Sequence, residues 1–445
     1  SHRYHPGQLE QYLCQEIFVY ADVPYRLKPF EALIKEPRNT VTYDIGRAEV
    51  IAERVKETGS DGKLLVALNG TIHRVNLLEK LLVTALSKIG NFVPGGGIWM
   101  NTQRPEWNDA NNALVGHGLS MVTLCYLRRF LVFLAELLME GGPEEFAVST
   151  EVAEFFSGID AVLKDHTPVL EGPVSAYDRK IIMDRLGQLG EVYRENIYPG
   201  FSGSRSCLEK SQILKFVDLS MKFLDHSITH SRRVDGLYHS YNLIHFESDG
   251  YGVEHLSEML EGQVAVLSSG YLGALEGLEL LEALRESKIY RSDQNSYMLY
   301  PYRKLPLFAE KNTLPSSAIE GSSWIQSELN SGRAQFIERD INGAVHFNGS
   351  FRNAQQLRLA LELESDSSSE DIDALCDVYE KVFGHRQFTG RSGAMYKYEG
   401  LGCIYWHMVS KLLLASAELI EFASDGGVEK NILNRLLSCF DEINA

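Results

Sequence analysis

Two long segments of this chain are apolar around nearly their whole circumference when they are drawn as helices. They are Leu114–Leu138 and Leu401–Ile420, and a helix without a polar face must be buried in a core. Other stretches show the three- and four-residue apolar spacing of amphipathic helices. The expected helices are 46–58, 75–90, 112–140, 147–165, 174–197, 207–230, 254–286, 353–364, 369–385, 399–424 and 427–443.

Long loops rich in Gly, Asn and aromatic residues separate these helices and exceed the length of ordinary connections. Alternating short and long loops predict a mainly α fold, an (α/α)6 toroid of helical hairpins whose loops line a central cleft at one end. A helical bundle and a solenoid are the competing arrangements. A short β-hairpin is expected at 335–350. We expect one catalytic-type domain over residues 1–445, either complete or a fragment of a larger chain.

The net charge of −17 disfavours nucleic acid and anionic membrane surfaces as partners, because both are negatively charged. No apolar run is long enough to predict a transmembrane helix. The six cysteines are scattered and lack the spacing of a zinc site, so buried free thiols in a reducing compartment are expected. We therefore expect a cytoplasmic protein without metal or cofactor, with a periplasmic or secreted location as the alternative.

The polar stretch Arg104–Asn112 places Glu106 and Asp109 three residues apart, on either side of Trp107. Carboxylates beside a large aromatic ring are typical of sugar sites, where the ring stacks on a pyranose and a carboxylic acid protonates the departing oxygen. Trp99 lies just upstream. The competing interpretation is that Asp109 caps the helix that follows. Candidate sugar-binding residues are Arg104, Trp107, Asn108 and Trp99.

Two further segments carry polar groups beside long helices. In Phe388–Gly400, hydroxyls, glycines and cations precede a helical run, which is a suitable setting for an anion, although ordinary loops look similar. In Arg232–Asn242, Asp235 is a candidate second carboxylate and His239 could bind an anion or a hydroxyl. A Tyr/His cluster closing over the core is the alternative there. Tyr238 and Tyr241 are candidate substrate contacts.

Two of these segments resemble motifs of the inverting glycoside phosphorylases, the group of cellobiose and chitobiose phosphorylases, and of relatives of cyclic β-1,2-glucan synthase. Glu-Trp-Asn-Asp at 106–109 is similar to the family's Asp-Trp-Asn-Asp, and Thr389-Gly390 with 392–396 resembles its Thr-Gly…Gly-Trp-Met-Tyr segment. Three features depart from the family pattern. Glu106 replaces an Asp, Ala394 replaces a Trp, and the family's large N-terminal β-sandwich is missing from this sequence.

The resemblance implies an (α/α)6 catalytic domain with Asp109 as general acid and with Thr389 and Gly390 as phosphate ligands. From the residues themselves, Arg391, Ser392 and His239 are further phosphate candidates, and Glu106 is the second choice as acid. The expected substrate is a di- or oligosaccharide, with inorganic phosphate as co-substrate and a homodimer as an open option.

Three functions remain open from the sequence. Phosphorolysis of a β-linked sugar with inversion needs one acid and an anion pocket. Inverting hydrolysis needs a second carboxylate to hold a water, roughly 6.5–9.5 Å from the acid, and Asp235, Glu399 and Glu106 are the candidates. A non-catalytic sugar-binding or scaffold domain needs neither.

Overall fold

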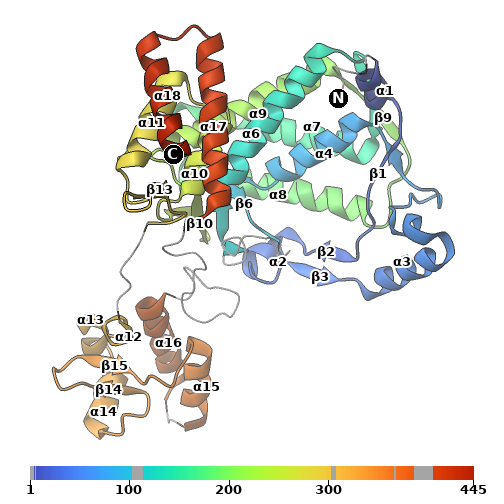
Figure 1. Cartoon of the computed structure of the whole chain (residues 1–445). Coiled ribbons are helices and arrows are strands. Elements are labelled where there is room, and N and C mark those ends of the chain that lie inside the picture. The colour runs from blue at the N-terminus through green and yellow to red at the C-terminus, as the bar shows by residue number, and fades with distance from the viewer. Residues whose placement is uncertain (1–4, 6, 103–113, 302–306, 365–366, 385–403) are drawn as a thin grey trace. The chain divides into compact units, whose positions relative to one another are not determined.

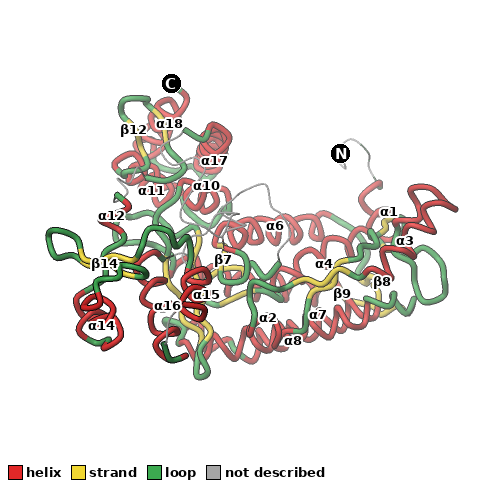
Figure 2. Tube along the Cα trace, turned by 90° about the horizontal axis from the view of Figure 1, so that it is seen from below, coloured by secondary structure: helices red, strands yellow, loops and turns green. Residues whose placement is uncertain are grey.

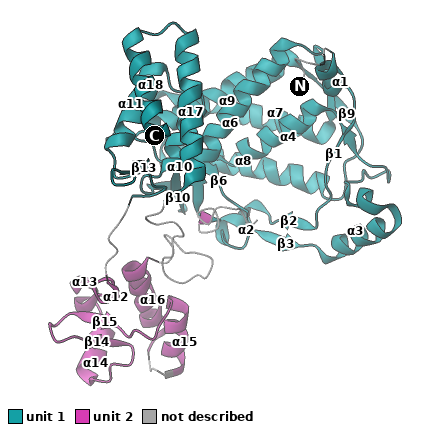
Figure 3. Cartoon of the chain, viewed as in Figure 1, with its two compact units in different colours: residues 1–103, 115–301, 402–445 teal, residues 104–114, 302–401 magenta. Residues whose placement is uncertain are grey.

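The computed structural model describes residues 5, 7–102, 114–301, 307–364, 367–384 and 404–445. Its contacts divide the chain into two compact units (Figure 3). Unit 1 comprises Ser1–Gln103, Val115–Pro301 and Gly402–Ala445, and unit 2 is built mainly from Tyr302–Leu401. The expected single domain over 1–445 stays a prediction.

Unit 1 is mainly helical, and its helices form two groups of neighbours (Figures 1 and 2). One group packs α6 against α9 and α7 against α4 and α8. In the other, α17 packs against α10 and α18, and α11 against α18. The helices of the unit are α1 (Gln8–Cys14), α2 (Phe30–Lys35), α3 (Ile45–Thr58), α4 (Leu77–Ile89), α6 (Met121–Glu140), α7 (Thr150–Asp165), α8 (Ala176–Ile197), α9 (Lys210–His230), α10 (Leu260–Ser268), α11 (Ala274–Glu286), α17 (Trp406–Asp425) and α18 (Lys430–Asn444).

Side-chain caps fix the start of several of these helices. The side chains of Asn76 and Ser120 accept hydrogen bonds from backbone N–H groups in the first turns of α4 and α6. Such caps satisfy donors that have no partner within the helix. The buried leucines of α6 lie on one side of the helix, whereas Phe133 and Met139 on the other side are exposed. The expectation that this segment is buried around its whole circumference is therefore wrong, because apolar composition alone does not show which side of a helix faces solvent.

A curled five-stranded antiparallel sheet crosses unit 1 in the order β11-β10-β7-β6-β5. One face packs against α2 and α8 through a cluster that includes Phe30, Trp99, Leu119, Met183 and Tyr251. The strands are β5 (Phe92–Val93), β6 (Gly97–Trp99), β7 (Gly118–Ser120), β10 (Tyr241–Phe246) and β11 (Tyr251–His255).

The other described strands of unit 1 form two-stranded sheets. They pair β1 (Phe18–Val19) with β4 (Arg74–Val75), β2 (Tyr25–Leu27) with β3 (Val41–Tyr43), β8 (Glu145–Ser149) with β9 (Arg205–Glu209), and β12 (Tyr290–Arg291) with β13 (Ser296–Tyr297). The 3-10 helices Gly59–Lys63 and Thr167–Glu171 lie between the larger elements.

Unit 2 has a hydrophobic core of its own, which includes Phe336, Phe347, Leu361, Tyr379 and Phe383. A core that is closed within one segment is the mark of an independent structural unit. Its elements are α12 (Phe308–Lys311), α13 (Ser316–Glu320), α14 (Ser323–Ser331), β14 (Ile337–Arg339), β15 (Val345–Phe347), α15 (Ala354–Glu364) and α16 (Ser369–Phe383).

Most of the helices expected from periodicity are present, and so is the short hairpin, as β14–β15. The mainly α class is confirmed, while closure of the helices into a toroid is not shown and stays a prediction. Several expected helices are wrong in extent: those at 147–165, 207–230 and 399–424 begin later, at Thr150, Lys210 and Trp406, and two others differ more. The 112–140 helix begins at Met121, because 118–120 pair as a strand, and the 254–286 helix is split into α10 and α11 around Gly270–Gly273.

Among the described helices, none combines the length and apolarity that crossing a membrane requires. The described cysteines are free, as expected. Of these cysteines, Cys125 and Cys376 are buried, as was also expected, and the other described ones are not. Cys14 and Cys207 are exposed, and Cys439 is partly buried. Helical periodicity placed these residues on apolar segments, but it could not tell which side each helix or strand turns to solvent.

Candidate functional site

The five-stranded sheet brings together two segments that the sequence singled out separately. Strand β7 pairs with β6 on one side and with β10 on the other. Leu119 is opposite Trp99 in one pairing and opposite Asn242 in the other. Trp99 and the 238–242 segment therefore belong to one sheet, although they are more than 130 positions apart in the sequence.

Many of the predicted site residues lie outside the described residues. These are Arg104, Glu106, Trp107, Asn108, Asp109, Thr389, Gly390, Arg391, Ser392 and Glu399. Their described flanks do attach to a common region. The first motif lies in the sequence between the neighbouring strands β6 and β7, and the second ends just before Ile404, which bridges to Met298. Leu299, which follows Met298, accepts a hydrogen bond through its carbonyl from the backbone N–H of Leu260 at the start of α10.

The first turn of α10 is tied closely to the chain that leads into β10. Gln263 accepts a hydrogen bond from the backbone N–H of Tyr238 and donates to its carbonyl, each over 2.8 Å. Ser240 accepts from the backbone N–H of Gly262 at 3.0 Å. A Cβ on Gly262 would lie 2.2 Å from the Ser240 hydroxyl oxygen, so the close approach of helix to strand requires glycine at this position.

A buried carboxylate in this turn was missed by the sequence reasoning. Glu261 is 8% exposed and accepts a hydrogen bond from the Tyr241 hydroxyl at 2.9 Å. Its charge also raises the pKa of Tyr126 on α6 and of Tyr405 before α17, after the larger effect of burial. The signal was a single acidic residue inside a helix whose other residues are almost all apolar or small.

Three predicted sugar contacts pack in the core of the described structure. Trp99, Tyr238 and Tyr241 are between 2% and 4% exposed. The Trp99 ring nitrogen donates to the carbonyl of Gly116 at 2.9 Å. Aromatic rings packed in this way stabilise the sheet and present no open face for stacking on a sugar. Their role as substrate contacts stays a prediction.

Asp235 lies on an exposed turn and is held by a neighbouring cation. Both of its oxygens accept hydrogen bonds from the Arg233 guanidinium, at 2.7–3.2 Å, and Glu258 lies 3.4 Å from the same group. The hydrogen bonds from Arg233 hold the pKa of Asp235 below its ordinary value. A carboxylate with a lowered pKa is a weaker general base.

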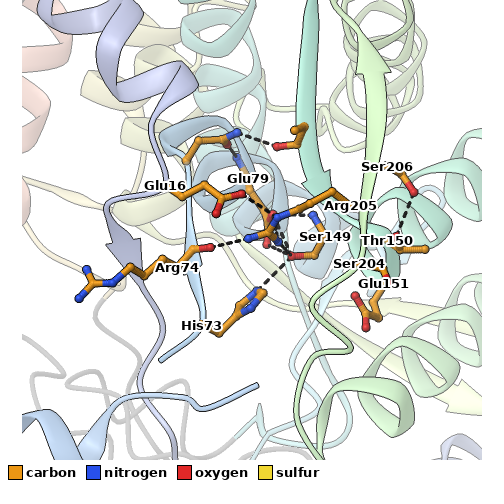
Figure 4. Close-up of polar contacts among 12 residues, drawn as sticks. Glu16, His73, Arg74, Glu79, Ser149, Thr150, Glu151, Ser204, Arg205 and Ser206 are labelled. Atoms are coloured by element: carbon orange, nitrogen blue, oxygen red, sulfur yellow. Dashed lines mark hydrogen bonds and ion pairs between the residues drawn. The ribbon is translucent and has the colours of Figure 1, made fainter. Parts of the chain in front are cut away.

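A second polar cluster lies in unit 1 away from the sheet, around Ser149 at the end of β8 (Figure 4). Ser149 is fully buried and contacts His73 at 3.1 Å, Arg205 at 2.7 Å and Glu79 at 2.9 Å. The residue types are those of a nucleophilic triad. In a triad, however, the carboxylate binds the histidine, whereas Glu79 here accepts from the backbone and hydroxyl of Ser149. The buried network therefore serves the fold.

His73 makes the stability of this network sensitive to acid. Burial lowers the pKa of His73 to about 4, and Arg205 acts in the same direction. The unfolded chain binds the proton near the ordinary value of 6.5, so protonation favours unfolding. The contribution of His73 is fully present above pH 6.5 and is lost as the pH falls towards 4. It amounts to about 3 kcal/mol.

We expect the free energy of unfolding of the wild type, measured with urea, to fall more steeply between pH 6.5 and 4 than that of His73→Gln. His239, whose pKa is also lowered to about 4, is present in both proteins, so the difference between the two curves reports His73. If the two stability curves ran parallel between pH 6.5 and 4, the lowered pKa of His73 in the folded protein would be contradicted.

Within the described ranges, no three His, Cys, Asp or Glu side chains come together in a way that could hold a metal ion. Residues 305–386 match the family model described as GH149 phosphorylase insertion domain 2. This segment of the chain is therefore similar to an insertion domain found in GH149 glycoside phosphorylases. No curated protein matches the chain.

The matched residues cover most of unit 2. The described elements of that unit, from Phe308 at the start of α12 to Phe383 at the end of α16, fall within the match. The contacts assign a longer stretch to this unit, Tyr302–Leu401 together with Arg104–Leu114. The match does not extend to unit 1, which carries the sheet and the flanks of both predicted motifs.

Proposed function

We propose that the protein is a glycoside phosphorylase that cleaves a β-linked di- or oligosaccharide with inversion. The observation that carries this proposal is the GH149 phosphorylase insertion domain at 305–386. The phosphorylase-like motifs around Asp109 and Thr389 support it independently, because they lie outside the matched residues.

In the proposed reaction, Asp109 protonates the glycosidic oxygen as the bond to the anomeric carbon breaks. Phosphate attacks that carbon from the opposite face, which gives an inverted sugar 1-phosphate and a shortened sugar. Thr389, Gly390, Arg391 and Ser392 supply donors to the phosphate. A protein with a net charge of −17 must concentrate positive potential locally to hold a dianion.

The described structure supports a common location for the two motifs. The first lies between β6 and β7, and β10 on the other side of β7 contacts α10 through the Tyr241–Glu261 hydrogen bond. The second is followed by Ile404 and α17, and α17 packs on α10. The described flanks of both motifs are thus connected to the same sheet and to α10.

Hydrolysis on the same scaffold is the alternative enzyme function. It needs a carboxylate to activate water. The described candidate, Asp235, is paired with Arg233 and has a lowered pKa, which makes it a poor base. This contact favours phosphorolysis, in which phosphate supplies its own nucleophile.

The deciding assay incubates the protein with β-linked glucose disaccharides and longer oligosaccharides, with and without inorganic phosphate. We expect a sugar 1-phosphate to form when phosphate is present, and no cleavage in its absence. Free reducing sugar released at the same rate without phosphate would favour the hydrolase. Binding of oligosaccharide without any product would favour a non-catalytic module.

A further inference from the structure

Two histidines stack beside the five-stranded sheet. The rings of His239, which precedes β10, and His255, at the end of β11, lie 4.0 Å apart between centroids and 9° from parallel. The β10–β11 pairing places His255 opposite Asn242. His239 is partly buried and His255 is exposed, so the stack reaches the surface.

Hydrogen bonds at the δ nitrogens fix the tautomer of both rings. Nδ1 of His239 lies 3.2 Å from the carbonyl oxygen of Leu256, which can only accept, so this nitrogen carries the proton. Asn242 donates through its amide nitrogen to the carbonyl of Gly96 at 2.6 Å. Its amide oxygen therefore faces Nδ1 of His255, at 2.7 Å, and that nitrogen also carries the proton.

The surroundings keep both rings neutral at pH 7. Burial lowers the pKa of His239 to about 4, and the neighbouring His255 acts in the same direction. Partial loss of solvent around the ring also lowers the pKa of His255, with further contributions from Arg179 and Arg233. Asp235 opposes the shift at His239, but it is paired with Arg233. A neutral ring protonated at Nδ1 has a lone pair at Nε2.

Neither Nε2 atom has a hydrogen-bond partner among the described residues. We propose that His239 and His255 together accept hydrogen bonds from hydroxyl groups of the carbohydrate, and so form part of its binding site. This inference rests on the proposed function for the class of ligand. It changes the role expected for His239, because a neutral Nε2 lone pair would face the negative oxygens of a phosphate without a proton to donate.

The test measures sugar binding to the full chain by calorimetry, with cellobiose, sophorose, laminaribiose and gentiobiose as probes and without phosphate. His239→Phe and His255→Phe keep a stacking ring and remove the acceptor. We expect each to raise the Kd of the sugar that the wild type binds by about tenfold, the loss of one hydrogen bond. His239→Gln and His255→Gln, which retain an acceptor oxygen, should recover most of the affinity.

The matched control is His245→Phe, since His245 is an exposed histidine on β10 whose Nε2 is paired with Glu254. It should leave the sugar Kd unchanged. Nitrogen-15 NMR of the wild type should show both rings protonated at Nδ1, with the Nε2 signals shifting when sugar is added.

An unchanged sugar Kd in both phenylalanine variants would overturn the inference. So would a rise in the KM for phosphate without a change in sugar affinity, or Zn²⁺ binding to the pair in place of sugar. These binding results can be told apart from a failure of the proposed phosphorylase function, which is measured by the formation of sugar 1-phosphate. A wild type that binds sugar through the pair but forms no sugar 1-phosphate would support the inference and refute phosphorolysis.

Discussion

Asp109→Asn is expected to lower kcat by two or more orders of magnitude, because an amide cannot protonate the departing oxygen. The neighbouring Trp107 can exclude water and so raise the pKa of a carboxyl group towards that of a useful acid. Sugar affinity should change little, since the amide has nearly the same shape and can still form hydrogen bonds. The measurement is the phosphate-dependent formation of sugar 1-phosphate from an unactivated disaccharide.

Glu106→Gln is the matched comparison, since Glu106 lies three residues away in the same motif. If Asp109 is the acid, Glu106→Gln should lower turnover less than Asp109→Asn does. A larger loss in Glu106→Gln, with near-normal turnover in Asp109→Asn, would transfer the role of acid to Glu106. A substrate with a good leaving group should restore much of the lost rate, because such a group departs without protonation.

Glu79→Ala is expected to lower the free energy of unfolding by about 3–5 kcal/mol, the typical cost of breaking a buried ionic network. Glu79 is 1% exposed and accepts hydrogen bonds from the backbone and hydroxyl of Ser149 and from the Tyr20 hydroxyl. Its removal leaves these donors without their acceptor and takes a negative charge from the vicinity of Arg205, 3.9 Å away. Urea unfolding at pH 7 measures the loss.

Two further variants test whether the network causes this loss. Glu154→Ala removes an exposed glutamate on α7, and its effect should stay within about 0.5 kcal/mol. Glu79→Gln keeps the size of the side chain and one acceptor oxygen, so its loss should be intermediate. A Glu79→Ala protein as stable as Glu154→Ala would show that the network contributes nothing to the fold.

The helices of this protein could be predicted from the sequence because their signal is local. In α8 and α9 the apolar residues repeat every three or four positions over 22 and 21 residues, which is long enough for the period to stand out. The β14–β15 hairpin was also predictable, since its strands are separated by a short turn. The five-stranded sheet was not, because β5, β6 and β7 have only two or three residues each and their pairing joins distant segments.

The candidate site was likewise predictable in part from the sequence and in part only from the tertiary structure. Residue types and spacing alone singled out the segments around Asp109, Thr389 and His239, because catalytic and anion-binding groups have recognisable local patterns. Tertiary structure alone decided that Glu261 is buried against Tyr241, and the local turn decided that Arg233 holds Asp235. Tertiary structure also decided which nitrogen of His255 carries the proton, because Asn242, 13 residues away, is oriented by the carbonyl of Gly96. Burial and hydrogen-bond partners set the charge state of a side chain, and folding decides both, even where the partner is as near in the sequence as Arg233 is to Asp235.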